Sequence, residues 1–477
     1  MNEPIWRWTA ERTARAIRTR EVSSREAVQS VLDRVAAVNS RINAVVDLMA
    51  DDALAEADRA DKAVQRGENL GLLHGVPVTV KINIDYAGRA TTNGVVAFKN
   101  NIAEQDSAPV ANLKKAGAVI FGRTNTPAFS HRHFTDNDLH GRTFNPWNPA
   151  RTPGGSSGGA SAAVCSGMGA IAHGNDRAGS VRYPAYACGV VGLRPTMGRV
   201  AGFNPSAKEE RGLFSQMTFV DGPLGRLISD VRLGLAALEG WDARDPAWTP
   251  AAPSRSIPKP IPVAVVASHP DAEIDSNVSA AIRRAAKLLE GAGYRVEEVM
   301  PPDFREPGAT FWKLVMTEER SATDAEQASS TRAIELYGDE AVKRVRAGYK
   351  ACVGEYDLDG YVKALASRNA MIRNWRMFLA RYPLVLMPVS WQLPFPIDYD
   401  QGGNEAMRRA LDATLPLLTI SALGLPGLSV PTGLIDGVPT GIQLVADRFQ
   451  EDLCFAAGEV IQAGCPVTIP EISNQEK

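Results

Sequence analysis

The sequence is poor in cysteine and has no long apolar segment. Its five cysteines include no C-x-x-C pair, which argues against a disulfide framework and against a zinc knuckle. No apolar run reaches the roughly 18 residues that span a bilayer, and the polar, charged N-terminus differs from a secretory signal. We therefore expect a soluble, cytoplasmic protein.

An excess of charge of either sign is also missing. The 477 residues include 52 basic and 54 acidic side chains, which gives a net charge of −2. Proteins that bind nucleic acid or anionic membranes usually carry a marked basic excess. Histidine is scarce as well, and none of the six lies in a motif that indicates a Ser–His–Asp arrangement. We expect no nucleic-acid partner and no membrane partner.

Apolar and turn-forming residues predict a helical start followed by alternating strands and helices. A capping box at Ser23 and Glu26 precedes apolar residues at helical spacing, so residues 1–70 are predicted to be helical. Residues 75–125 follow the order strand, helix, strand, and residues 261–300 repeat it. This order predicts a mainly parallel sheet covered by helices.

The segment 245–262 is rich in proline and serine and is predicted to be a surface connection. It is compatible with a domain boundary and equally with a long loop inside one domain. Residues 303–383 are predicted to be helical and carry scattered aromatic side chains.

Three residues stand in contexts that favour chemistry. Lys81 ends the strand-like "GVPVTVK", Ser156 lies in "GGSSGG", and Ser180 lies in "GNDRAGSVRYPA". Taken singly, they are compatible with a solvated lysine, a flexible linker and a turn serine. The glycine run is short, however, and leads directly into the apolar "AAVCSGMGAIA". Glycines on both sides of Ser156 therefore indicate close backbone approach.

These motifs resemble those of the amidase signature family. The similarity is densest between residues 75 and 200, in "GVPVTVK", "TNTPAF", "TPGGSSGG", "AGSVRYPA" and "CGVVGLRPT", and resumes in "LPGLSVPTGLIDGVPTGIQLV". It implies a single compact α/β/α domain with a large mixed, mainly parallel sheet, and no cofactor or metal. Residues 1–70 would pack on the core, 71–477 would form the α/β domain, and 303–383 would shape the substrate pocket.

The resemblance also implies a Ser–Ser–Lys triad. Ser180 would attack the carbonyl carbon, Ser156 would relay the proton, and Lys81 would be the base. A serine hydroxyl needs such a base at neutral pH, and lysine serves when burial keeps it neutral. The peptide bond between Gly155 and Ser156 would be cis. The oxyanion hole would be formed by the backbone N–H groups of four residues, Arg177, Ala178, Gly179 and Ser180.

Candidate substrate-binding residues also come from the resemblance. They are Ser130, His131, His133, Gly155 and Trp391. A metal site at the two histidines is the alternative, but no third ligand motif lies nearby. The chain departs from the usual family wording at Ile82, Ala128, Asn175, Arg177 and Ala178. We expect the Arg177 side chain to point to solvent.

The function expected from these motifs is hydrolysis of carboxylic amides or related C–N acyl bonds, including anilides and carbamates, through an acyl-enzyme. Three alternatives stay open: a carbamate (urethane) or hydrazide hydrolase, the glutaminase subunit of a tRNA-dependent amidotransferase, and a non-catalytic binding protein. The expected partner is a small amide or carbamate substrate. A homodimer is compatible with the N-terminal helices.

Overall fold

The computed structural model describes residues 3–207, 209–252, 257–302, 304–321 and 331–472. Its centre is an 11-stranded sheet in the order β1-β3-β2-β4-β6-β5-β10-β11-β9-β7-β8. The strands are β1 Val45–Leu48, β2 Pro77–Lys81, β3 Val119–Thr124, β4 Ile171–Asp176, β5 Val191–Arg194, β6 Val220–Gly225, β7 Pro262–Val265, β8 Arg295–Glu298, β9 Leu384–Met387, β10 Gly427–Ile435 and β11 Val438–Ala446.

The sheet is mixed, as predicted, but the expectation that it is mainly parallel is wrong. Among the described strands, six pairings are antiparallel and four are parallel. The two predicted strand–helix–strand units do form parallel pairs, β2 with β3 and β7 with β8. The antiparallel contacts come largely from strands joined by tight turns or from distant parts of the chain, which the local pattern does not reveal.

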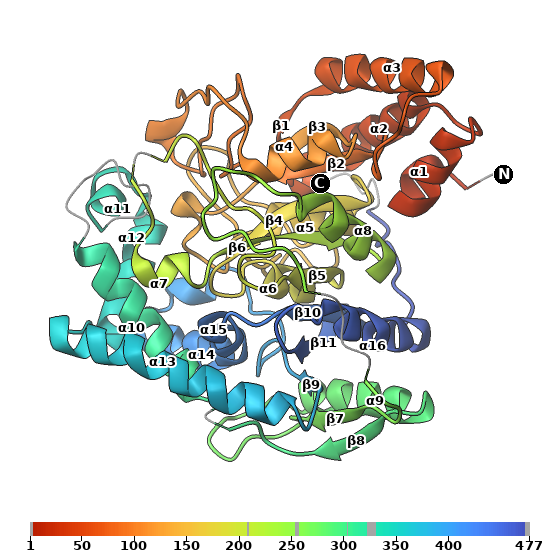
Figure 1. Ribbon diagram of the computed structural model, residues 1–477. Helices are drawn as coiled ribbons and strands as arrows, with labels where there is room; N and C mark the ends of the chain where they lie inside the picture. The colour runs from red at the N-terminus through yellow and green to blue at the C-terminus, as the bar shows by residue number, and fades with distance from the viewer. Residues whose placement is uncertain (1–2, 208, 253–256, 303, 322–330, 473–477) are drawn as a thin grey trace.

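Helices cover the sheet and form the edges of the molecule. They are α1 Ala10–Arg18, α2 Ser24–Ile42, α3 Ala50–Arg66, α4 Ala108–Lys115, α5 Gly158–Cys165, α6 Arg182–Cys188, α7 Leu213–Gln216, α8 Ile228–Leu238, α9 Ser276–Gly291, α10 Glu306–Ser321, α11 Thr331–Tyr337, α12 Glu340–Val353, α13 Leu358–Leu379, α14 Gly403–Ala413, α15 Leu415–Leu423 and α16 Glu451–Gly464. Figure 1 shows α10–α13 on the side of the molecule away from α1–α3. None of the helices, as far as they are described, is long and apolar enough to cross a membrane.

The N-terminal segment contributes a strand as well as helices. The predicted capping box is confirmed, because Ser23 Oγ accepts from Glu26 N–H and the Glu26 carboxylate accepts from Ser23 N–H. β1 pairs with β3 and extends the sheet, a strand that the purely helical prediction for 1–70 missed. After the 245–262 connection, β7 joins the same sheet through β9.

The order of the central strands brings the candidate residues to one edge. β2 and β4 are parallel neighbours, so their C-terminal ends lie side by side. Lys81 is the last residue of β2, and the loop that leads to Ser180 follows β4 directly. Helix α5 begins immediately after the glycine–serine run. Three segments distant in sequence therefore meet at the same place.

Candidate active site

Lys81 is fully buried and holds the centre of the site. Its Nζ lies 2.7 Å from Ser156 Oγ and 2.8 Å from Asn175 Oδ1. Burial lowers the pKa of Lys81 from 10.5 to about 7, although the negative charges of Asp221 and Asp176 partly oppose this shift. A substantial fraction of the amine is therefore neutral, and able to accept a proton, near neutral pH.

The glycine–serine run is a tightly packed turn. The peptide bond between Gly155 and Ser156 is cis, as the resemblance implied. A Cβ atom on Gly155 would lie 2.3 Å from the carbonyl oxygen of Arg132, so a side chain has no room there. Thr135 Oγ1 donates to the carbonyl oxygen of Gly154 at 2.8 Å and holds the turn from the other side. This packing keeps the Ser156 hydroxyl against Lys81.

A buried carboxylate shapes the loop that carries Ser180. Asp176 accepts from the backbone N–H of Gly179 at 2.8 Å and from Arg182 Nε at 3.0 Å. Burial by itself would raise the pKa of Asp176, but Arg182 and Arg194 hold it well below its usual range. Gly179 has φ of 100°, a conformation that favours glycine. The fixed charge thus folds the loop into one conformation.

This loop also determines which backbone donors face the cavity. The N–H of Gly179 is directed to Asp176 and is not free for a substrate oxygen. Within the described part of the chain, the N–H groups of Ala178 and Ser180 form no hydrogen bond. The N–H of Ser157 donates to the carbonyl oxygen of Ser180 at 3.2 Å, which joins the two serine segments.

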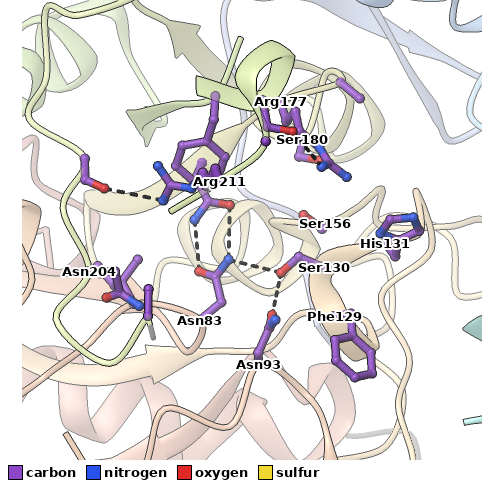
Figure 2. Close-up of a pocket in the computed structure, with 18 of the residues that line it drawn as sticks. Asn83, Asn93, Phe129, Ser130, His131, Ser156, Arg177, Ser180, Asn204 and Arg211 are labelled. Carbon is purple, nitrogen blue, oxygen red and sulfur yellow. Dashed lines mark hydrogen bonds between the residues drawn. The ribbon is translucent and has the colours of Figure 1, made fainter. Parts of the chain in front are cut away.

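Ser156 and Ser180 line the same cavity, whose volume is about 490 Å³. Figure 2 shows them together with a hydrogen-bonded row of Asn83, Ser130 and Asn93 along one side. Aromatic side chains of Phe129, Trp312 and Tyr349 form another part of the wall. The cavity therefore combines a polar reaction centre with flat apolar surfaces.

The predicted pocket residues Ser130, His131 and His133 all line this cavity. The His131 ring lies 5.9 Å from that of Trp312 and 6.2 Å from that of Tyr349, between centroids. Burial lowers the pKa of His131 to about 4, so its ring is neutral at pH 7. His133 Nε2 lies 3.2 Å from the carbonyl oxygen of Ala178.

The assignment of Gly155 and Trp391 to the substrate wall does not agree with the structure. Gly155 packs against the backbone of residues 132–134. Trp391 lines a second cavity, where its ring contacts Phe304 and His269. The proline-rich loop around Trp391 thus turns away from the reaction centre, a direction that its composition does not reveal.

The expectation that Arg177 points to solvent is wrong. Its guanidinium donates to Glu319 Oε1 at 3.1 Å and to Ser215 Oγ at 3.3 Å. Glu319 lies on α10, also pairs with Arg346, and lies 3.6 Å from His131 Nε2. Helix α10 is therefore tied to the loop that precedes the nucleophile.

Sequence reasoning missed several lining residues. Asn83 and Asn93 carried no signal beyond their neighbourhood to Lys81 and to the first strand–helix–strand unit. Asn175 stood out only as a departure from the usual motif, and Trp312 and Tyr349 only as scattered aromatics. In the described ranges, no group of three or more His, Cys, Asp or Glu side chains could hold a metal ion.

Comparison with known proteins gives consistent relatives. Residues 26–455 match the sequence model of the family described as Amidase. The indoleacetamide hydrolase of Bradyrhizobium diazoefficiens is 44% identical over 462 residues, which cover 96% of this chain and 87% of the relative. The glutamyl-tRNA(Gln) amidotransferase of Moorella thermoacetica has an A-type subunit that is 35% identical and covers 93% of each chain. A solved structure of 6-aminohexanoate cyclic dimer hydrolase with substrate matches with a TM-score of 0.83 at 26% identity, over 98% of this chain and 99% of that one.

Proposed function

Because this chain belongs to the amidase family and is a hydrolase of non-peptide C–N amide bonds, we propose that it cleaves the primary amide of an arylacetic acid, with indole-3-acetamide as the test case. The observation that carries the mechanism is the contact of 2.7 Å between Lys81 Nζ and Ser156 Oγ in a cavity that Ser180 also lines. A buried lysine, a relay hydroxyl and a second hydroxyl in one cavity are the parts that acyl transfer needs.

The proposed reaction begins with attack of Ser180 Oγ on the amide carbon. As the O–C bond forms, the Ser180 proton passes to Ser156 Oγ and the Ser156 proton passes to the neutral Lys81 amine. The carbonyl electron pair moves to oxygen. When the C–N bond breaks, Lys81 returns its proton through Ser156 to the leaving nitrogen, and ammonia departs from a primary amide. Water then attacks the Ser180 ester by the same relay and releases the carboxylic acid.

The negative charge on the carbonyl oxygen needs fixed donors. We propose that the N–H groups of Ala178 and Ser180 stabilise it, with Arg177 completing the loop. Gly179, which the resemblance included, already donates to Asp176 in this structure. One such donor typically contributes about 3–4 kcal/mol to lowering the barrier.

The aromatic wall supports an aryl acyl group. The rings of Trp312 and Tyr349 stack at 4.3 Å between centroids and 25° between planes, which presents a flat apolar surface. The neutral His131 ring lies against it. The relative named indoleacetamide hydrolase provides the specific aryl group to test.

The test is release of ammonia and indole-3-acetic acid from indole-3-acetamide by the purified protein. We expect turnover by the wild type and loss of at least about 10³-fold with Ser180→Ala. Ser166→Ala is the matched control, because Ser166 is also buried and its hydroxyl has no hydrogen-bond partner among the described residues. A fluorophosphonate should label the wild type and the control but not Ser180→Ala. Undiminished turnover by Ser180→Ala would reject the mechanism.

A substrate panel separates the remaining alternatives. Anilides, carbamates and hydrazides of the same acyl group report on the leaving group, and glutamine reports on the glutaminase alternative. Turnover of glutamine without turnover of arylacetamides would favour the amidotransferase function. The homodimer stays a prediction, which sedimentation of the purified protein would measure.

A further inference from the structure

Asn175, the last-but-one residue of β4, makes an unusual contact for an asparagine. It is almost fully buried, and its side-chain oxygen faces Lys81 Nζ at 2.8 Å. The lysine amine donates hydrogen bonds, so the acceptor end of the amide must face it. The donor end of Asn175 then points to Asn83, whose side-chain oxygen accepts at 3.0 Å.

Asn83 holds this amide in one orientation. It returns a hydrogen bond from Nδ2 to Asn175 Oδ1 at 3.3 Å, so the two amides are paired in both directions. Asn83 also donates to Ser130 Oγ at 3.0 Å, and Ser130 donates to Asn93 Oδ1 at 2.7 Å. Figure 2 shows this row running from Asn83 through Ser130 to Asn93 along the cavity. A flip of the Asn175 amide would break the pairing with Asn83.

A fixed acceptor next to Lys81 has a consequence for proton transfer. A neutral lysine has two N–H bonds and one lone pair, and the amine rotates freely about its last C–N bond. It can accept the Ser156 proton only while the lone pair points to Ser156. A hydrogen bond from one N–H to Asn175 removes part of that rotational freedom, with the two partners on different sides of the nitrogen.

We propose that Asn175 is a positioning residue, which aims the Lys81 lone pair at Ser156 through an amide that Asn83 holds in place. This inference rests on the role of Lys81 as base in the proposed function. The other groups around the amine do not take that place. Asp221 pairs with His173 Nε2 at 2.9 Å, and Asp176 pairs with Arg182 and Arg194. His173 Nδ1 faces the backbone N–H of Lys81, at 3.5 Å.

Two substitutions at one position should move the acid limb of the kcat/KM profile in opposite directions. Asn175→Asp places a carboxylate beside the amine and favours the charged form, so we expect the limb to rise by about one pH unit or more, which lowers kcat/KM at pH 6 about tenfold. Asn175→Leu keeps a similar size but removes the acceptor, so we expect the limb to fall. Its plateau should also drop, by about 10- to 100-fold, because the amine is no longer oriented.

Controls separate this role from a general loss of packing. Asn112→Asp adds a charge at another buried asparagine, on α4, whose amide donates to the carbonyl oxygens of Leu238 and Gly240. It should leave the acid limb where it is. Asn83→Ala frees the Asn175 amide without touching Lys81, and it should lower the limb and the plateau less than Asn175→Leu does. It also tests the proposal if an Asn175 variant does not fold.

Lys81→Ala is measured beside these variants. If Lys81→Ala keeps wild-type turnover, the base assignment fails and this inference fails with it. If Lys81→Ala is inactive but the Asn175 and Asn83 variants lower the rate with an unmoved acid limb, the base assignment holds and the positioning role of Asn175 is refuted. Opposite shifts for Asn175→Asp and Asn175→Leu support it.

Discussion

The pH dependence of catalysis tests the central feature of the site, the buried amine of Lys81. Burial lowers its pKa from 10.5 to about 7, and the neutral form is the base. Activity should therefore be lost as the pH falls through about 7. From this pKa, the neutral fraction is about one-eleventh at pH 6 and ten-elevenths at pH 8, so kcat/KM should rise about tenfold between them. With an ordinary lysine pKa the neutral fraction at pH 8 would be well under 1%.

The assay uses indole-3-acetamide, which carries no charge across the range, at constant ionic strength from pH 5 to pH 10. Lys81→Arg is the matched variant, since a guanidinium keeps its charge throughout and should leave no rising limb and little activity. The two histidines of the cavity titrate elsewhere, because burial lowers the pKa of His131 to about 4 and that of His133 below 6.5. A limb near 4, a limb near 10 or an active Lys81→Arg enzyme would refute the reasoning.

Three further predictions concern stability, each measured as a urea unfolding curve. Lys81→Met should stabilise the protein by about 4 kcal/mol at pH 7 and by less at pH 9, because the unfolded lysine binds a proton that the folded one loses between its folded pKa of about 7 and 10.5; equal gains at both pH values would contradict this. Gly155→Ala should destabilise by about 1–3 kcal/mol or more, since its Cβ would meet the Arg132 carbonyl oxygen at 2.3 Å, and an unchanged midpoint would show that the turn can move. Arg182→Leu should cost about 3–5 kcal/mol by leaving Asp176 buried with only part of its compensation, whereas a neutral effect would mean that Arg194 suffices.

The reacting groups were predictable from the sequence because the chemistry is written in local patterns. Glycines on both sides of Ser156 indicate a crowded turn, and a lysine at the end of a strand-like run indicates a position at a sheet edge. The structure brings Lys81 and Ser156 into contact, with Ser180 in the same cavity. The helices at 107–117 and 277–293 were found for the same reason, since caps and apolar spacing lie within one segment.

Features that depend on distant partners were not predictable. The direction of Arg177 is decided by Glu319, which lies 142 residues further along the chain. Trp391 and the aromatic pair Trp312 and Tyr349 have similar compositions around them, yet only the pair reaches the cavity. The antiparallel half of the sheet likewise joins strands far apart in sequence, such as β5 and β10.

The amino-acid sequence by itself thus determined which residue types carry the reaction and how the backbone bends around them, because those properties are set within a few neighbouring residues. Only the tertiary structure decided the protonation state of Lys81 and the lining of the cavity. Desolvation and orientation arise from atoms that other segments bring in, such as the Asn175 amide and the wall of α10 and α12. These depend on packing across the whole sheet, which no local pattern encodes.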